Sequence, residues 1–94
     1  MQKNNFKGYK LDFTKKASKE LKKLEENIIK KIGNKLRDLI TGNPNVDFSK
    51  LETPDDATYR LVCGDYRIIC EIHNHIITVL VIKIAHRKEV YRDY

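Results

Sequence analysis

The chain has 94 residues, of which 40% are hydrophobic and 34% are charged, and its formal net charge is +6. This length suits one domain with a single modest core, and the composition is that of a compact soluble protein rather than a disordered segment. The positive charge favours anionic partners, but many small helical proteins carry lysines on solvated faces, so charge alone does not establish nucleic-acid binding.

The sequence shows no membrane or secretory segment. The longest apolar run, residues 76–84, contains Thr78 and Lys83 and is far shorter than the roughly 20 residues of a membrane-spanning helix. The N-terminus lacks the apolar stretch of a signal peptide, and two cysteines in this context indicate a reducing compartment. We therefore expect a cytoplasmic protein without membrane contacts.

The first half of the chain predicts a strand followed by two helices. Residues 8–13 alternate apolar and polar side chains, which indicates a short strand with one buried face. Thr14 suits a helix N-cap, and apolar residues then recur at three- and four-residue steps over 17–40. A single long helix is possible, but residues 25–27 fit better as a break between two antiparallel helices, with Gly42 as the final C-terminal cap.

The second half predicts a polar connection and then a β-sheet. Residues 43–56 are rich in Asn, Asp and Pro, whereas residues 58–63, 66–73 and 76–86 are rich in branched and aromatic side chains. The sequence therefore predicts one α+β domain over residues 1–94, in which a small antiparallel sheet of about four strands carries the two helices on one face.

Gly64-Asp65 suits a two-residue type II′ turn, and such a turn fixes the register of the hairpin around it. Leu61 then lies opposite Ile68, and side-chain alternation gives two faces. The core face holds Tyr59, Leu61, Cys63, Tyr66, Ile68, Cys70 and Ile72, and the other face holds Arg60, Val62, Arg67, Ile69, Glu71 and His73.

The same register separates the two cysteines. Cys63 and Cys70 lie about four strand positions apart, or roughly 13 Å. A disulfide needs Cα atoms within about 7 Å. We therefore expect two core thiols and no bridge.

Three arginines are the first candidates for a functional site. Arg60, Arg67 and Arg87 carry permanently charged guanidinium groups, which bind phosphate in a forked geometry and stack on bases, so together they suit an RNA backbone. The alternative is that each one pairs with a neighbouring carboxylate at a solvated sheet edge (Asp65, Glu71 or Glu89).

His73 and His75 flank Asn74 in the second turn. The pattern His-x-His is found in zinc sites, but the sequence places no third or fourth ligand nearby. We therefore predict a solvated turn and no metal site.

Three motifs resemble those of the RelE/ParE family of toxins. They are a hairpin, the end of the last strand and the segment after it: Tyr59-Arg60-Leu61-Val62-Cys63-Gly64-Asp65-Tyr66-Arg67, His86-Arg87 and Val90-Tyr91. The element order matches as well, so the resemblance covers nearly the whole chain and implies the family's microbial RNase-like fold. The hairpin is shared with the gyrase-poisoning ParE branch, whereas His-Arg with a trailing Val-Tyr is more typical of the ribonuclease branch.

The resemblance implies the toxin of a type II toxin–antitoxin system, an endoribonuclease that cuts mRNA in the ribosomal A site and inhibits translation. It implies no metal and no other cofactor. The 2′-hydroxyl attacks the adjacent phosphate and leaves a 2′,3′-cyclic phosphate and a 5′-hydroxyl. By position, Arg67 would stabilise charge on the phosphorane, Arg87 would assist the leaving oxygen and Tyr91 would act as the base. The implied RNA-binding residues are Arg60, Lys50 and Lys88.

The identity of the base stays open between Tyr91 and His86. Many RelE toxins have a second lysine where this chain has Val62. A tyrosine has an ordinary pKa of about 10, so it needs nearby cations to act as a base. A histidine titrates closer to neutral pH, and some relatives use one at this end of the site, although His86 is also readily explained as a core residue.

The resemblance also implies a cognate antitoxin bound over the basic surface, and contact with operator DNA only through that antitoxin. Two other functions remain open at this point. One is a ParE-type toxin that poisons gyrase, in which the arginines are scaffold and surface. The other is an inactive relic that still binds its antitoxin.

Overall fold

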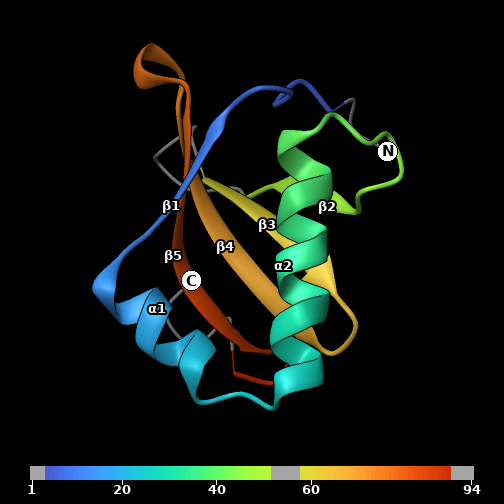
Figure 1. Cartoon of the computed structure of the whole chain (residues 1–94), viewed down its shortest axis with the longest axis vertical. Helices are drawn as coiled ribbons and strands as arrows, with labels where there is room; N and C mark the ends of the chain where they lie inside the picture. The colour runs from blue at the N-terminus through green and yellow to red at the C-terminus, as the bar shows by residue number, and fades with distance from the viewer. Residues whose placement is uncertain (1–3, 52–57, 90–94) are drawn as a thin grey trace.

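Two helices cover one face of a five-stranded sheet in the computed structural model, which describes residues 4–51 and 58–89 (Figure 1). The elements follow in the order β1 (Lys10–Phe13), α1 (Lys15–Lys22), α2 (Glu26–Ile40), β2 (Phe48–Lys50), β3 (Thr58–Cys63), β4 (Tyr66–His73), a 3₁₀ turn (Asn74–Ile76) and β5 (Thr78–His86). The strand order is β1-β5-β4-β3-β2. The predicted α+β class, with its helices on one face, is confirmed.

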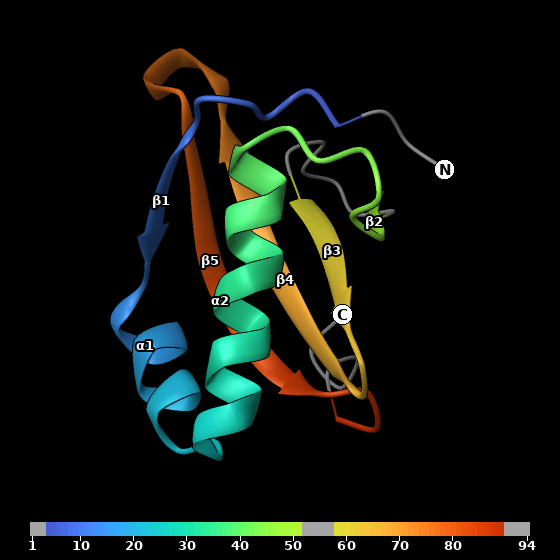
Figure 2. The same ribbon diagram turned by 45° about the vertical axis from the view of Figure 1, so that its right-hand side comes forward.

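The helices begin and end close to where the sequence places them. The Thr14 hydroxyl accepts a hydrogen bond from the Ala17 amide at 3.1 Å, as expected of an N-cap. The break falls at residues 23–25, and Gly42 has the left-handed φ of 82° that suits the residue after a helix. Figure 2 shows α2 lying lengthwise over the sheet. In the described part of the chain, no helix is long and apolar enough to cross a membrane.

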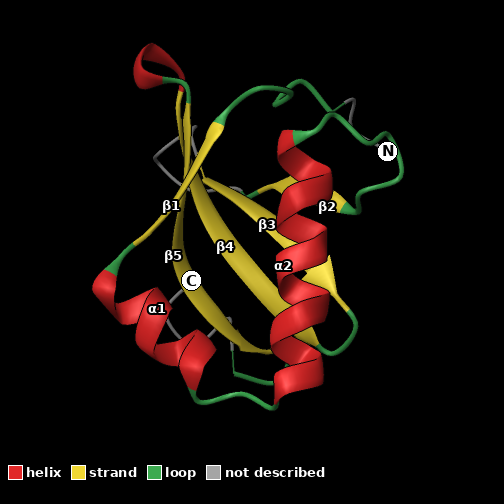
Figure 3. Ribbon diagram, viewed as in Figure 1, coloured by secondary structure: helices red, strands yellow, loops and turns green. Residues whose placement is uncertain are grey.

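Two features of the sheet differ from the sequence prediction. The strand β2 lies inside the expected polar connection, where Phe48 pairs with Leu61 and is buried. The strand β1 runs parallel to β5, so the sheet is mixed rather than antiparallel (Figure 3). A three-residue strand is too short to give a periodic pattern, and the direction in which β1 pairs is set by the route of the chain through the helices.

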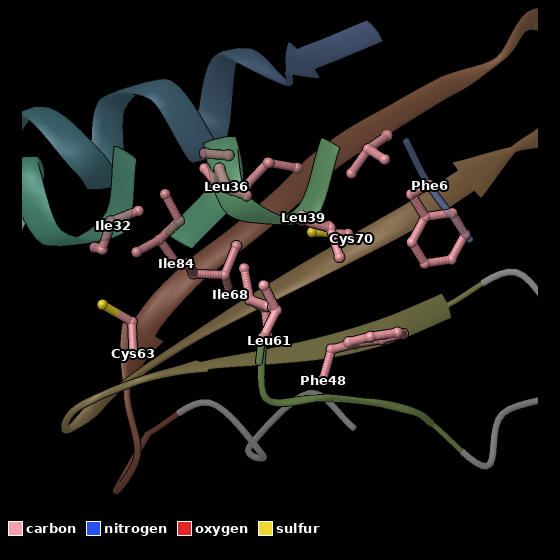
Figure 4. Close-up of a cluster of buried hydrophobic side chains, with 14 of the residues drawn as sticks. Phe6, Ile32, Leu36, Leu39, Phe48, Leu61, Cys63, Ile68, Cys70 and Ile84 are labelled. Carbon is pink, nitrogen blue, oxygen red and sulfur yellow. The ribbon is translucent and has the colours of Figure 1, made fainter. Parts of the chain in front are cut away.

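The β3–β4 hairpin has the predicted register. Leu61 pairs with Ile68 and Cys63 with Tyr66. Gly64 has a φ of 57°, whereas Asp65 is not in the positive-φ region, which is the sign pattern of a type II′ turn. The helix side of this hairpin packs against α1 and α2 in one hydrophobic cluster (Figure 4). The helices contribute Ala17, Ile32, Leu36 and Leu39, and the hairpin contributes Leu61, Ile68 and Cys70.

A β-bulge changes the faces of β5. Ile69 pairs with Lys83 and Cys70 pairs with Val81, so Ile82 is an extra residue on β5. Before the bulge Val81 faces the core, and after it Ile84 does. Without the bulge, strict alternation from Val81 would turn Lys83 into the core, where a charge is costly. The bulge therefore directs Lys83 to the opposite side of the sheet.

Both cysteines are free and buried, as predicted. Burial raises the pKa of the Cys70 thiol to about 12, and it also raises the pKa of Cys63. Because the thiolate is the reactive form, both thiols should react very slowly at neutral pH. We expect almost no colour release from a disulfide reagent with the native protein and reaction of both thiols in denaturant. Fast reaction of the native protein would contradict the buried placement.

Candidate functional site

The face of the sheet opposite the helices gathers three cationic side chains, and we call it the basic face. Arg60 on β3 and Lys83 on β5 both pair with Ile69 on β4, so they flank it in one row across the sheet. Arg67 lies two residues before Ile69 on the same strand and face. Arg67 is therefore a diagonal neighbour of Arg60 and of Lys83 across the ladders, and such neighbours are roughly 7–8 Å apart. The three cations Arg60, Arg67 and Lys83 therefore surround one position, and they are the first part of the candidate site.

Sequence reasoning did not identify Lys83 as a site residue. In the sequence it only interrupts an apolar run, and the bulge that brings it to the basic face has no clear local signal. Lys83 is 8% exposed, and Ile69 beside it is fully buried. Lysine is almost never this buried unless it is paired, so the position itself is the signal of a specialised environment.

The edge strand β2 holds Arg60. Ser49 pairs with Arg60 across the β2–β3 ladder, and the Arg60 Nη2 donates a hydrogen bond to the Ser49 hydroxyl oxygen at 3.1 Å. A fixed guanidinium loses less conformational entropy when it binds a ligand. The strand that the sequence did not predict therefore helps to hold one cation of the candidate site.

Arg67 is held by the β3–β4 turn. Its Nη1 donates to the carbonyl oxygens of Gly64 at 2.8 Å and Tyr66 at 3.0 Å. These acceptors are neutral, so the full positive charge of the guanidinium remains. Within residues 4–51 and 58–89 the Arg67 side chain contacts backbone carbonyls and no carboxylate, so the expected alternative does not apply to it there.

Arg87 follows β5 directly and contacts the same turn. Its amide donates to the Asp65 carbonyl oxygen at 2.7 Å, and its Nε lies 3.7 Å from the Asp65 carboxylate Oδ1. The carboxylate pairing expected as the alternative therefore occurs here in part. The two side chains are 57% and 65% exposed, and exposed ion pairs of this kind contribute only about 0–1 kcal/mol. The contact is therefore a weak one, and the Arg87 side chain stays exposed to solvent beside it.

His86 lies on the other side of the sheet from Arg67. It pairs with Tyr66, and the two rings meet edge to face with centroids 5.6 Å apart. Its Nδ1 accepts a hydrogen bond from the Lys88 amide at 3.2 Å. In the neutral ring the proton then sits on Nε2, so the second nitrogen is a donor rather than a proton acceptor.

The remaining predicted residues divide into three groups. Lys50 lies on the edge strand β2 and pairs with Tyr59. Its exposed side chain is therefore on the helix side of the sheet and not on the basic face. Lys88 is exposed in the turn after β5. Tyr91 lies outside the described residues. The structure therefore brings Arg60 and Arg67 to one face, places Arg87 at the turn that holds Arg67, and puts Lys50 on the other side of the sheet.

The two histidines of the second turn have local partners. His73 Nε2 lies 3.1 Å from the Glu71 carboxylate, and the His73 and His75 rings are 6.2 Å apart. Among the residues that the structure describes, no group of three His, Cys, Asp or Glu side chains could hold a metal ion.

The helices carry a second basic surface. Their exposed lysines lie across the sheet from the basic face: Lys15, Lys16, Lys19, Lys22, Lys23, Lys30 and Lys31. The excess positive charge of the chain is therefore divided between two sides of the molecule.

Together these features define a small α+β protein whose sheet is covered by helices on one side and lined by cations on the other. The family model described as "ParE toxin of type II toxin-antitoxin system, parDE" matches residues 11–91. The mRNA interferase toxin RelE of Escherichia coli (strain K12) is 30% identical over 89 residues, which cover 92% of this chain and 93% of that protein. The chain belongs to the RelE/ParE superfamily of toxins, in its RelE-type branch.

Solved structures agree with this assignment. A chain of the RelB-RelE antitoxin-toxin complex from Methanococcus jannaschii matches with a TM-score of 0.72 and 25% identity, over 88% of this chain and 98% of that one. A chain of the archaeal RelE-RelB complex from Pyrococcus horikoshii OT3 matches with a TM-score of 0.70 and 27% identity, over 88% and 99%.

Proposed function

We propose that this protein is the toxin of a type II toxin–antitoxin system, and that it acts in the cytoplasm, where it cleaves mRNA in the ribosomal A site. The observation that carries the proposal is the gathering of Arg60, Arg67 and Lys83 on the face opposite the helices, with Arg87 at the adjoining turn. A related protein with 30% identity is an mRNA interferase, which agrees with this function.

The proposed reaction is an attack of the 2′-hydroxyl on the adjacent phosphate. The phosphorane gains negative charge as the new bond forms, and fixed cations that stabilise this charge lower the barrier. Arg67 suits this role because two carbonyls hold its Nη1 while its charge remains. Arg87 assists the 5′ oxygen as it leaves. The cations take the place that metal ions have in other nucleases, so the proposed reaction needs none.

Tyr91 is the base that we assign. His86 faces the other side of the sheet from Arg67, and its Nδ1 already accepts the Lys88 amide. Both features count against His86 as a base at the phosphate. The cations of the basic face would favour the deprotonated form of a tyrosine near them.

The binding residues divide between two surfaces in this proposal. Arg60 binds a flanking mRNA phosphate from the basic face, and Lys88 binds RNA from the exposed turn after β5. Lys50 takes the helix side of the sheet, so it suits the ribosomal RNA surface rather than the scissile strand.

A cognate antitoxin is the protein partner that we propose. The similar structures from M. jannaschii and P. horikoshii are complexes of RelE with RelB. An acidic segment would be attracted to either basic surface of this chain. Contact with operator DNA would come only through the antitoxin.

Primer-extension mapping on translating ribosomes tests the function. Wild-type protein should give cuts at fixed codon positions, which persist in excess chelator and fall to a small residual level in Arg87→Ala. Arg37→Ala, which removes an exposed arginine from α2, is the matched control and should cut normally. Loss of cutting in chelator would contradict the proposed metal-free reaction.

A second candidate function is gyrase poisoning, because the matching family model is described as a ParE toxin. Intact mRNA together with gyrase-dependent DNA breaks would support this function and refute the nuclease. If neither effect occurs and tight antitoxin binding remains, the chain is an inactive relic.

Lys83 provides a further prediction for the nuclease. Lys83→Met keeps an unbranched side chain and removes the charge beside Ile69, so we expect cleavage to fall about tenfold, which is the equivalent of about 1.4 kcal/mol. Lys22→Met on the exposed side of α1 is the control, and its cleavage rate in bound ribosome complexes should stay at the wild-type value. A wild-type rate in Lys83→Met, measured on the same ribosome complexes, would exclude Lys83 from the site.

A further inference from the structure

The turn between β3 and β4 contacts both arginines that the proposed reaction uses. The Gly64 and Tyr66 carbonyls accept from Arg67, and the Asp65 carboxylate and carbonyl contact Arg87. These three consecutive residues therefore act as a template that contacts two guanidinium groups, one on β4 and one directly after β5.

The turn geometry makes this template possible. Gly64 adopts a φ of 57°, which L-residues with side chains rarely adopt. The turn brings β4 back against β3 in two residues, so Arg67 lies close enough to reach the carbonyls on both sides of Asp65. Asp65 lies at the tip of the β3–β4 turn, so its carboxylate is exposed to solvent and can contact Arg87.

The contacts use one part of each guanidinium. Arg67 contacts the turn through Nη1, and Arg87 contacts Asp65 through Nε. An arginine has five N–H donors, so a phosphate can bind the terminal nitrogens of Arg87 while Nε stays near the carboxylate. Asp65 can therefore orient Arg87 without occupying the atoms that would meet the substrate.

We propose that Asp65 is a positioning residue, which holds the Arg87 guanidinium at the end of the basic face for the leaving oxygen. This inference rests on the proposed nuclease function. The backbone bond from the Arg87 amide to the Asp65 carbonyl sets where the residue lies, and the carboxylate sets the direction of its side chain. A small misplacement of a catalytic group has a large effect on rate, so an exposed contact is sufficient for this role.

Asp65→Asn tests the proposal because it keeps the size of the side chain and the capacity for the turn. We expect the single-turnover cleavage rate to fall about fivefold while binding to the ribosome complex stays unchanged or becomes tighter. Asp65→Glu restores a carboxylate and should recover most of the rate. In an Arg87→Ala background, Asp65→Asn should have no further effect, because the group that it positions is absent.

Glu71→Gln is the matched control. Glu71 is a carboxylate of the same face, but it contacts His73 rather than an arginine. A wild-type rate in Asp65→Asn, or an equal loss in Glu71→Gln, would overturn the proposal. An equal fall in the Arg87→Ala background would also overturn it. If the wild-type protein cuts no mRNA, the proposed nuclease function fails. If wild type and Asp65→Asn cut at equal rates, the nuclease function stands and only the positioning role of Asp65 is refuted.

Discussion

Replacing Arg67 by alanine is expected to lower the single-turnover cleavage rate by about 10²–10³-fold, the range found when one charge-stabilising donor is removed from an active site. The guanidinium of Arg67 is held in place, since its Nη1 makes two hydrogen bonds to turn carbonyls. A preorganised charge stabilises a transition state without the cost of reorganisation. Arg67→Lys should recover little, because an ammonium cannot hold both carbonyls and a phosphate in the same forked geometry.

The fold should survive this change. Arg67 lies outside the hydrophobic cluster, and the turn carbonyls that it releases are near the surface, where water can replace it. We expect the free energy of unfolding to fall by no more than about 1 kcal/mol. Circular dichroism and thermal melting would check this, with Arg37→Ala as the arginine control. Cleavage by Arg67→Ala at the wild-type rate would refute the role of the basic face.

The β3–β4 hairpin could be predicted because its register depends on local information. A two-residue Gly64-Asp65 turn leaves one possible pairing, so the partners of Leu61 and Cys63 follow directly, and with them the face that holds Arg60 and Arg67. The helices could be predicted for the same reason, since Thr14 and the apolar spacing are local signals.

The parts that could not be predicted depend on distant contacts. The bulge at Ile82 arises where β5 must keep Val81 and Ile84 in the core, and it moves Lys83 to the basic face. The sequence names Asp65 among three possible carboxylate partners for the arginines, but it cannot assign Asp65 to Arg87, because that pairing depends on where β5 ends. The shared face of Arg60 and Arg67 could therefore be predicted, whereas the residues that hold the arginines and the placement of Lys83 could not.

The separation of the two basic surfaces bears on how the protein would meet a ribosome. The sheet lies between the helix lysines and the basic face, so one side can contact structured RNA while the other holds a single strand. Long-range attraction to RNA depends on the summed charge, whereas cleavage depends on fixed groups near one phosphate. Lysine substitutions on α1 should therefore weaken association and make it less sensitive to salt, with little effect on the rate of bound complexes.

Replacing Tyr91 by phenylalanine is expected to lower the single-turnover rate by about 10²–10⁴-fold, the range typical of a lost general base. Tyr91→Phe removes only the hydroxyl, so it tests proton transfer more directly than truncation does. His86→Gln should have a much smaller effect, because His86 faces away from Arg67 and its Nδ1 accepts the Lys88 amide. Rates measured at saturating protein on stalled ribosomes would separate chemistry from binding.

The pH dependence of the wild-type rate gives an independent check on the base. A base acts in its deprotonated form, so the rate rises with pH until the base has lost its proton. The ordinary pKa is about 10 for a tyrosine and about 6.5 for a histidine, so even with its pKa lowered by nearby cations a tyrosine base should let the rate rise to higher pH than a histidine base would. A plateau near neutral pH, with a large loss in His86→Gln and a small one in Tyr91→Phe, would transfer the role to His86. Its ring would then have to give up the Lys88 amide before it could take the proton.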